Sequence, residues 1–346
     1  MRTIIITGSA GLVGSESCFF FLKKGFKVIG IDNNFRRYFF GPSGDTNWIK
    51  KKLLNFKNYS HYSIDIRDLS RLSKIFKKES KKIKCIIHAA AQPSHDWAKR
   101  ELHTDFSINA LGTLNLLKLM KRFSKNASFI FLSTNKVYGD NPNKINFIEK
   151  KYRWEFPRKH IYFNGFNEGL SIDNCIHSFF GVSKTYADLL VQEFGKNFNL
   201  NTVVLRAGCI TGPNHSGAKL HGFLSYLIKQ AKQNKTYEIF GYKGKQVRDN
   251  IHSADLINFF WEFMKKPRKG EIYNIGGGRK SNCSILEAIN IIEDYLKIKI
   301  KLKYNEKNRT GDHICYITNM KKIKQHYPNW KQKYTVKKII YELINC

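Results

Sequence analysis

The N-terminal stretch constrains the fold of this chain more than any other, because it places a glycine-rich turn between two apolar runs. Thr3–Ile6 is a short, mostly β-branched run, the turn spans Thr7–Gly14, and Leu12–Lys24 has the character of a helix. A second apolar run, Lys27–Ile31, then ends at Asp32. A strand, a glycine turn, a helix and a strand that ends on an acid are typical of a dinucleotide-binding βαβ unit.

Each glycine of this turn has its own expected task. Gly8 permits the tight turn, Gly11 lets the backbone approach a pyrophosphate, and Gly14 lets the helix pack closely against the strand. The amide groups at the start of the helix, those of Leu12 and Val13, then face the phosphates. The alternative is a glycine turn in an ordinary α/β protein that binds no nucleotide.

Asp32 indicates which dinucleotide to expect. A carboxylate at the end of the second strand can accept hydrogen bonds from the adenosine ribose, and it would repel the 2′-phosphate of NADP. Asn33 follows it and is assigned to the same site. Arg36 and Arg37 lie just beyond and could favour NADP, but the acid argues the other way. The expected cofactor is therefore NAD.

Length and composition exclude several other classes of protein. With 346 residues, 42% hydrophobic and 25% charged, the chain is long enough for a large core and is not disordered. No apolar run reaches the roughly eighteen residues of a membrane span, and the N-terminal strand lacks the flanks of a signal peptide. Seven scattered cysteines without a C-x-x-C spacing indicate reduced thiols in a cytoplasmic protein. No metal site is expected.

The formal net charge of +33 is the most unusual property of the sequence. Strongly basic proteins can bind nucleic acid, anionic membranes or polyanionic substrates. Here the lysines come in pairs along the whole chain, from Lys23–Lys24 to Lys321–Lys322, without a single basic tail. This pattern favours a solvated lysine-rich surface over a nucleic-acid partner.

Apolar runs continue to alternate with helical patterns as far as Leu205. The segment Asn33–Tyr59 is long and irregular with a basic helix near Asn47–Leu54, and Asp140–Ser178 is aromatic and looped. The alternation predicts an α/β fold with a Rossmann-type, doubly wound parallel sheet and with ligands beyond the carboxyl ends of its strands. The expected strands are His61–Ile64, Lys84–His88, Ser128–Leu132 and Asn201–Leu205, and the expected helices are Asp68–Glu79, Asp105–Phe123 and Phe180–Asn199.

Beyond residue 210 the regular alternation of strand and helix patterns ends. We expect an NAD-binding domain over residues 1–210 and a smaller C-terminal α/β substrate lobe over residues 211–346, with an approximate boundary that the chain can cross more than once. In the second part the expected helices are His221–Gln233, Ala254–Met264 and Ser284–Tyr295, and the expected strands are Tyr237–Gly241, Gln246–His252, Glu271–Ile275 and Lys299–Tyr304.

Ordered motifs beyond the glycine turn strengthen the prediction. They are Asp65–Ile66, His88–Ala91, Asn109–Thr113, Val137–Gly139, Gly181–Lys184, Arg206, Gln246–Asp249 and Arg309–Asp312. Together they resemble the extended short-chain dehydrogenase/reductase family, specifically its NAD-dependent nucleotide-sugar epimerases and dehydratases, over nearly the whole chain. Within that family, Ser133–Asp140 and Gly244–Asp249 look most like segments of enzymes that invert C2 of a CDP-deoxyhexose.

The resemblance implies transient oxidation of a sugar carbon, followed by reduction from its other face. Thr134 would hydrogen-bond the reacting oxygen, and Lys184 would bind the nicotinamide ribose and lower the pKa of a catalytic tyrosine. The residues it assigns to the cofactor are Gly8, Gly11, Leu12, Val13, Gly14, Asp32, Asn33, Asp65, Ile66, Ala89, Ala90, Asn109 and Lys184. The residues it assigns to the substrate are Gln92, Asn135, Lys136, Arg248 and Arg309, of which the two arginines suit a diphosphate.

Further expectations concern the substrate side and the oligomer. Cys209, Thr211 and His215 follow the sixth strand and are expected to line the substrate side. The family's dehydratases carry Asp–Glu where this chain has Asn135–Lys136, so dehydration is disfavoured. The resemblance also implies a homodimer, formed by Asp105–Phe123 and Phe180–Asn199.

One departure from the family pattern bears on catalysis. The family's proton acceptor is a tyrosine four residues before Lys184, and this chain has Phe180 there, which has no proton to exchange. Three interpretations remain: another group acts as the base, the protein binds NAD and a nucleotide sugar without efficient catalysis and could also bind RNA, or it performs different sugar chemistry. We favour the first, and the candidate bases are Tyr138, His95, Asp96, His177 and Tyr186.

Overall fold

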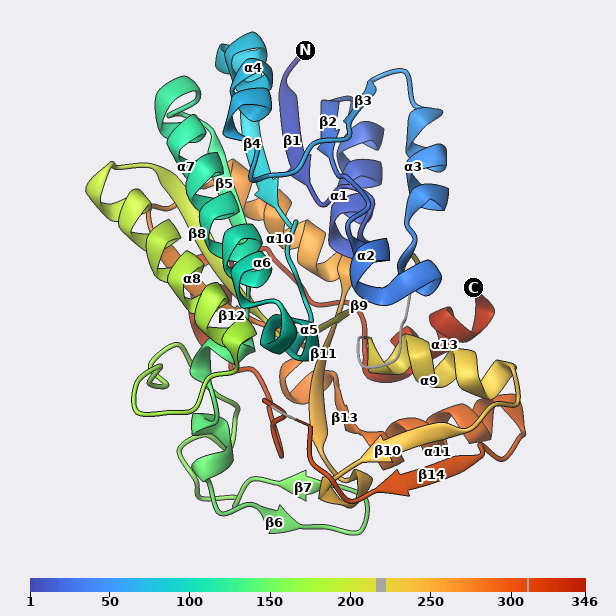
Figure 1. Ribbon diagram of the computed structural model, residues 1–346. Coiled ribbons are helices and arrows are strands. Elements are labelled where there is room, and N and C mark those ends of the chain that lie inside the picture. Colours follow the sequence, from blue (N-terminus) through green and yellow to red (C-terminus); the bar gives the residue numbers. More distant parts are fainter. Residues whose placement is uncertain (216–221, 310) are drawn as a thin grey trace.

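A seven-stranded parallel sheet forms the centre of the molecule (Figure 1). The computed structural model describes residues 1–215, 222–309 and 311–346, so His221, the start of one expected helix, and Thr310, within the motif Arg309–Asp312, lie outside the described residues. The strand order is β12-β8-β5-β4-β1-β2-β3, which confirms the predicted Rossmann-type sheet. The strands are β1 (Thr3–Thr7), β2 (Lys27–Ile31), β3 (Tyr59–Tyr62), β4 (Ile83–His88), β5 (Ser128–Thr134), β8 (Asn201–Ala207) and β12 (Glu271–Ile275).

Helices cover both faces of this sheet, and strand periodicity explains how. Successive side chains of a strand point to opposite faces, so Ile4 and Ile6 of β1 join one buried cluster and Ile5 joins the other. On the first face lie α1 (Leu12–Lys23), α3 (Asn47–Leu54), α10 (Ser253–Lys265) and α12 (Lys321–His326). On the second lie α4 (Leu69–Glu79), α7 (Gly112–Phe123) and α8 (Phe179–Asn197).

The helix expected over Asp105–Phe123 is not a single α-helix. It consists of α6 (Leu102–Phe106), a π-helical turn over Ser107–Leu111, and α7. Within it, the Asn109 side chain donates to Asp105 Oδ1 at 3.0 Å and to Ser183 Oγ of α8 at 3.1 Å. The wider turn depends on these tertiary contacts, which hydrophobic periodicity does not reveal.

The strand Glu271–Ile275 was expected in the smaller lobe, and that prediction is wrong. As β12 it extends the central sheet beside β8, with Tyr273 paired to Leu205. Tyr273 and Ile275 belong to the same buried cluster as Leu205. The apolar side chains of β12 are therefore buried at the edge of the central sheet. The chain therefore returns to the first domain after entering the second.

The remaining elements form a smaller α/β part with its own core (Figure 1). β9 (Cys209–Thr211) and β11 (Val247–His252) pair in parallel, and β13 (Asn282–Ser284) pairs antiparallel with β11. β10 (Tyr237–Phe240) and β14 (Leu302–Asn305) form a separate parallel pair. The helices are α9 (Phe223–Lys232), α11 (Ile285–Leu296) and α13 (Val336–Asn345).

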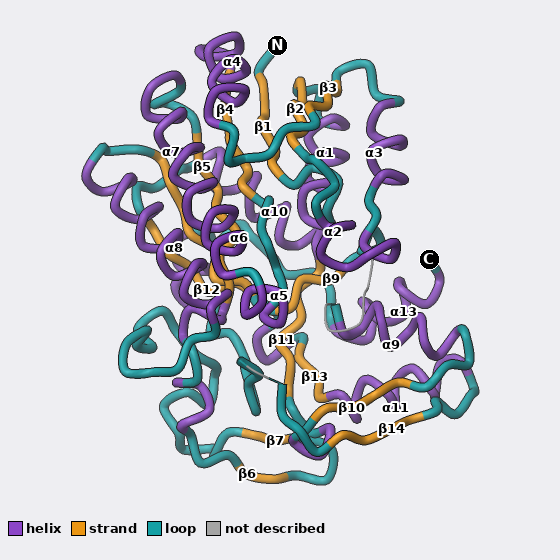
Figure 2. Tube along the Cα trace, viewed as in Figure 1, coloured by secondary structure: helices purple, strands orange, loops and turns teal. Residues whose placement is uncertain are grey.

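Loops carry more structure than the sequence indicates (Figure 2). The stretch after β2 contains α2 (Arg36–Phe40) before α3, and the loop after β4 contains α5 (His95–Arg100). The stretch 140–178 includes the short antiparallel pair β6 (Ile148–Glu149) and β7 (Trp154–Glu155). It also buries Phe156 and Phe166 against Tyr138 and Tyr316, which gives it a small core of its own.

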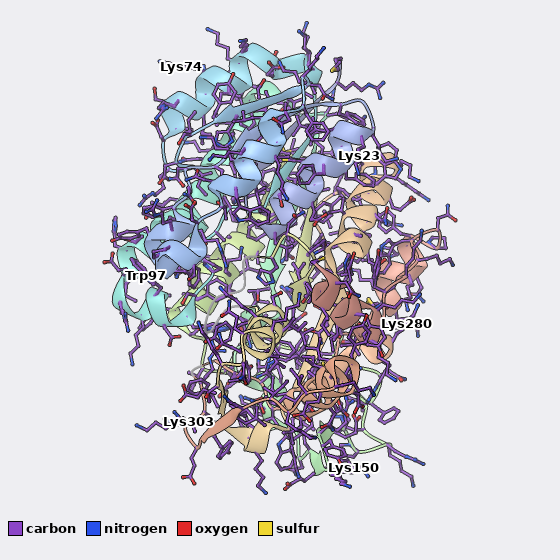
Figure 3. The ribbon with its side chains drawn as sticks, turned by 90° about the vertical axis from the view of Figure 1, so that its right-hand side faces the viewer. Lys23, Lys74, Trp97, Lys150, Lys280 and Lys303 are labelled. Atoms are coloured by element: carbon purple, nitrogen blue, oxygen red, sulfur yellow. The ribbon has the colours of Figure 1, made fainter. Side chains whose placement is uncertain are left out.

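Lysine side chains are spread around the molecule (Figure 3). Those labelled there, Lys23, Lys74, Lys150, Lys280 and Lys303, lie near opposite ends and sides. Such a spread is typical of a solvated basic surface. Within the described residues, no helix combines the length and the apolar character that crossing a bilayer requires.

Candidate active site

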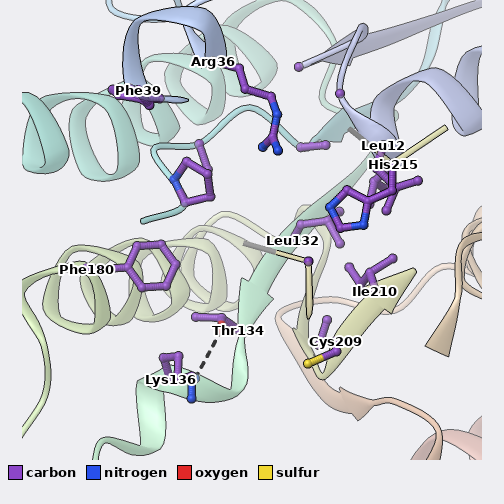
Figure 4. A pocket seen from close by; sticks show the side chains of 18 of the residues that line it. Leu12, Arg36, Phe39, Leu132, Thr134, Lys136, Phe180, Cys209, Ile210 and His215 are labelled. Atoms are coloured by element: carbon purple, nitrogen blue, oxygen red, sulfur yellow. Dashed lines mark hydrogen bonds between the residues drawn. The ribbon is translucent and has the colours of Figure 1, made fainter. Parts of the chain in front are cut away.

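A cavity of about 480 Å³ lies at the carboxyl edge of the central sheet. In Figure 4, Leu12, Arg36 and His215 lie in the upper half of the view, and Thr134, Lys136 and Phe180 lie in the lower half. All residues assigned to the cofactor line this cavity except Asn109, and all those assigned to the substrate line it except Gln92. Thr134, Cys209, Thr211 and His215 line it as well.

The glycine turn forms a cradle that a side chain would fill. Gly8 has φ +67°, and a Cβ atom there would lie 2.7 Å from the Ala90 amide nitrogen. A Cβ atom on Gly14 would lie only 1.9 Å from the Gly8 carbonyl oxygen. No side chain caps the N-terminus of α1, so the partnerless N–H groups of its first turn, on Leu12 and Val13, can bind phosphate. The cradle fits a dinucleotide.

Asp32 lines the cavity, and its carboxylate can accept further hydrogen bonds. Its Oδ2 accepts from the Ala10 amide at 2.9 Å and its Oδ1 accepts from the Asn34 amide at 2.7 Å. A carboxylate can accept about four hydrogen bonds, so both oxygens retain lone pairs for ribose hydroxyls. Arg37 is one of the two arginines that could favour NADP. It forms an exposed ion pair with Asp45, at 3.8 Å.

Gln92 and Asn109 lie behind the cavity wall, where they bind each other. The Gln92 amide donates to Asn109 Oδ1 at 3.0 Å, and Asn109 Nδ2 donates to the Gln92 carbonyl at 3.1 Å. Gln92 Nε2 also donates to Asp105 Oδ1 at 2.9 Å. Both carboxamides are buried and hydrogen-bonded within the protein, where they support the loop after β4, and their assignment to substrate and cofactor stays a prediction.

Thr134 and the Lys184 ammonium group both lie near the end of β5. Thr134 is the last residue of that strand, and its Oγ1 accepts from the Lys136 amide at 3.2 Å. Lys184 Nζ donates to the Leu132 carbonyl at 2.6 Å. Burial lowers the pKa of Lys184 to about 7, against the opposing effect of Asp188 and Asp105. Phe180, one turn earlier on α8, lines the same cavity.

A buried ion pair supports this end of the strand, and sequence reasoning missed it. Arg206 Nε and Nη2 donate to the two carboxylate oxygens of Asp188, both at 2.9 Å. Ser133, next to Thr134, donates to Asp188 Oδ2 at 2.6 Å. The available signal was that Asp188 lies four residues after Lys184, on the same face of the helix.

Cations gather where the turn after β5, which carries Lys136, meets the smaller part, which carries Arg248 and Arg309. Lys136 Nζ donates to the Gly311 carbonyl at 2.8 Å, and burial lowers its pKa to about 8. Arg248 donates to Asp312 Oδ2 at 2.5 Å and to the His313 carbonyl at 2.7 Å. Arg309 lines the cavity near the same carboxylate. Positive charge at this end suits a diphosphate, although Asp312 already engages one of the arginines.

Comparison with known proteins identifies the family. The profile of the NAD dependent epimerase/dehydratase family matches residues 4–163 and 168–276. The chain belongs to this family. The predicted resemblance is thereby confirmed, and NAD is the cofactor on which the family depends.

Relatives in this epimerase/dehydratase family span almost the full chain. CDP-paratose 2-epimerase from Salmonella typhi is 31% identical over 96% of this chain and 96% of its own length. UDP-glucuronate 4-epimerase from Thermodesulfobacterium geofontis is 27% identical over 100% of this chain and 96% of its own. Among solved structures, UDP-glucuronic acid 4-epimerase from Bacillus cereus, in complex with UDP-glucuronic acid and NAD, has a TM-score of 0.80 at 25% identity and covers 99% and 98% of the two chains.

The family's tyrosine is absent here, and four of the five candidate replacements lie away from the cavity. Tyr138 is buried, where its hydroxyl donates to Asn274 Oδ1 at 2.7 Å and accepts from Arg206. The His177 ring is bonded to the Ile172 carbonyl at 2.9 Å. Asp96 and Tyr186 are exposed and line no part of it. His95 alone among these five lines the cavity.

The described residues contain no group of three or more His, Cys, Asp or Glu side chains arranged to hold a metal ion. The seven cysteines are free thiols, four of them buried. Burial raises the pKa of the Cys209 thiol in the cavity wall. A neutral thiol is a weak nucleophile, so this residue serves as part of the wall.

Proposed function

We propose that this protein is an epimerase that inverts C2 of a CDP-deoxyhexose by transient oxidation to a ketone and reduction from the opposite face. The observation that carries the proposal is one cavity with the dinucleotide cradle and Thr134–Lys184 on one side and a cluster of cations on the other. The likeness to CDP-paratose 2-epimerase over 96% of the chain supports this substrate class.

Different residues of the chain would hold the cofactor and orient the sugar. Bound NAD supplies the chemistry of taking a hydride from the sugar carbon and returning it. Gly8, Leu12 and Asp32 would hold it, through the cradle, the helix amides and the ribose hydroxyls. Thr134 would orient the reacting oxygen. Lys184, whose pKa burial lowers to about 7, would donate to the nicotinamide ribose or favour a developing alkoxide.

The residues after Thr134 argue against water elimination. Asn135 has no acidic proton, and Lys136 carries the opposite charge from the glutamate of the family's dehydratases. Lys136 also donates to the Gly311 carbonyl, which holds its ammonium group against the sugar side of the wall. A cation there can bind a sugar hydroxyl or the substrate phosphate, whereas elimination requires an acid and a base.

Incubation with CDP-paratose in D₂O tests this function. We expect formation of the C2 epimer without deuterium at C2, because the hydrogen that leaves the carbon returns to it without exchange with water. Product is followed by NMR and mass spectrometry, with CDP-glucose as the comparison substrate. Deuterium at C2 would contradict transient oxidation, and failure to turn over any CDP-sugar would contradict the epimerase function.

A second candidate function follows from Phe180. A protein with the cradle and the cations but without the phenol could bind NAD and a nucleotide sugar and leave them unchanged. In that case NAD and CDP would bind with ordinary affinity in calorimetry, while no sugar would be converted. The same assay therefore separates the two functions.

We also propose a homodimer formed through α6, α7 and α8. Exposed apolar side chains recur at three- and four-residue spacing along α8, which aligns them on one stripe. They are Phe179, Val182, Tyr186 and Leu189, next to Leu102, Phe106 and Leu111. The Phe106 and Tyr186 rings, 5.6 Å apart, join the two helices into one apolar surface. Such a surface is typical of an interface between identical subunits.

The substitution Leu189→Asp is expected to convert the dimer to a monomer. The matched control is Leu302→Asp, because both leucines are 44% exposed but Leu302 lies on β14, away from the stripe. Light scattering should give twice the chain mass of 40.3 kDa for the wild type and the control, and a single chain for Leu189→Asp. Equal masses for the two variants would contradict this interface.

Free thiols and the absence of disulfides among the described residues support a reducing compartment. We therefore propose a cytoplasmic location. A cytoplasmic enzyme that remodels an activated deoxysugar would supply polysaccharide biosynthesis.

A further inference from the structure

We propose that His95 is the proton acceptor of this active site, in place of the phenol that Phe180 lacks. This inference rests on the proposed epimerase function. It assigns to the imidazole Nε2 atom the proton that leaves the sugar hydroxyl during oxidation and returns to the oxygen during reduction.

The fold places His95 directly beside the missing phenol. It is the first residue of α5, whose N-cap Ser94 accepts from the Trp97 amide, in the loop that follows β4 at the carboxyl edge of the sheet. Its ring lies 4.9 Å from the Phe180 ring, edge to face at 62°. Phe180 is one helical turn before Lys184 on α8. The imidazole therefore lies at the side of the cavity where a tyrosine would present its hydroxyl.

A second group orients the imidazole, as an acid–base histidine requires. His95 Nδ1 and Ser178 Oγ are 2.6 Å apart, and Ser178 Oγ is held in turn by the Gly181 amide at 3.1 Å, as the N-cap of α8. When Nδ1 carries the hydrogen and donates to Ser178, Nε2 is an acceptor. Nε2 has no hydrogen-bond partner within the described residues and is not fully enclosed.

The neighbouring loop leaves room for this ring. Gly311 has φ +71°, and a Cβ atom there would lie 2.9 Å from His95 Nδ1 and Cε1. A larger residue at this position would push the imidazole away from Ser178. The same loop carries the Gly311 carbonyl that binds Lys136 Nζ at 2.8 Å, so the lysine and the histidine flank one glycine.

The charges around His95 couple its basicity to substrate binding. Burial is the main cause that lowers the pKa of His95 to about 3, the cations Lys136 and Arg309 contribute in the same direction, and Asp312 opposes them. The neighbouring histidine of this wall, His313, is itself held neutral by burial, which lowers its pKa. The ring is thus unprotonated and able to accept at neutral pH. A substrate diphosphate on Arg309 would offset the cations, so the bound substrate makes the imidazole a stronger base.

The step balances within one catalytic cycle. The O–H bond of the sugar breaks and an Nε2–H bond forms, the O–H electron pair becomes the second bond of the C=O group, and the carbon gives up a hydride, for which bound NAD would be the acceptor. The reverse transfers then occur at the opposite face of the ketone. No external oxidant, reductant or water is consumed.

The test combines the loss of the imidazole with restoration of the phenol. With CDP-paratose as substrate, His95→Gln should lower kcat about 100-fold or more, with KM changed less than about threefold. Adding Phe180→Tyr to His95→Gln should recover most of the activity, because Thr134 and Lys184 remain in place for a tyrosine. Asp96→Asn, at the exposed neighbour of His95, should behave as the wild type.

A second readout does not depend on turnover. In protein labelled with ¹⁵N-histidine, the His95 pKa should rise on addition of CDP and should also rise in Lys136→Met, because each change removes the effect of a cation. An active His95→Gln variant would overturn the assignment while leaving the epimerase function intact. A His95 pKa that shifts neither on addition of CDP nor in Lys136→Met would do the same. A wild-type chain that converts no CDP-sugar would overturn both.

Discussion

Gly14→Ala is expected to weaken NAD binding about a hundredfold. Its Cβ atom would lie 1.9 Å from the Gly8 carbonyl oxygen, 2.6 Å from the Gly8 carbonyl carbon and 2.8 Å from Ser9 Cα. All three are backbone atoms, so no side-chain rotation relieves the overlap and α1 must move away from the turn. Overpacking of this kind costs about 3 kcal/mol or more, which is roughly a hundredfold in affinity. Calorimetric titration with NAD measures the loss.

The matched control for Gly14 is another glycine-to-alanine substitution outside the cavity. A Cβ atom on the exposed Gly169 would approach only the Asn167 side chain, at 3.1 Å, and that side chain can turn aside. Gly169→Ala should bind NAD as the wild type does. Affinity of Gly14→Ala within threefold of the control would contradict the role given to the glycine turn.

Asp188→Asn is expected to destabilise the fold by about 3–5 kcal/mol, because it leaves a buried guanidinium without its countercharge. Asp188 and Arg206 are 0% and 3% exposed and form two hydrogen bonds with each other. Asparagine has nearly the same size as aspartate, so the loss of stability measures the contribution of the charge. Urea unfolding followed by circular dichroism measures it. Activity should fall as well. Asp188 raises the pKa of Lys184 against the effect of burial, so the substitution should lower that pKa further.

Glu262→Gln provides the control, since it makes the same change from carboxylate to amide in an exposed ion pair. Glu262 Oε1 accepts from Lys265 at 2.5 Å, and the glutamate and lysine side chains are 19% and 48% exposed. Exposed pairs of this kind contribute about 0.3–0.5 kcal/mol. Similar losses of stability in the two variants would show that the Asp188–Arg206 pair does not anchor the end of β5.

The sequence by itself was sufficient for the features that depend on neighbours along the chain. Alternating apolar runs and amphipathic helices predicted the parallel sheet, because strand and helix periodicities are local. The turn Thr7–Gly14 and Asp32 predicted the dinucleotide site for the same reason. Ordered motifs predicted the family, which the profile match confirms. The assignments of Thr134, Lys184, Arg248 and Arg309 stay predictions, although all four line the cavity.

Tertiary structure alone decided what depends on contacts between distant segments. The π-helical turn and the return of β12 to the central sheet have no local signature, and the spacing of Asp188 from Lys184 does not reveal that Asp188 pairs with Arg206. His95 and Ser178 are 83 residues apart, and their contact exists only because the loop after β4 meets the start of α8. At the glycine turn short-range sterics were enough to predict the cofactor. The group that replaces the phenol depends on packing, because only burial and proximity distinguish His95 from the other candidate bases.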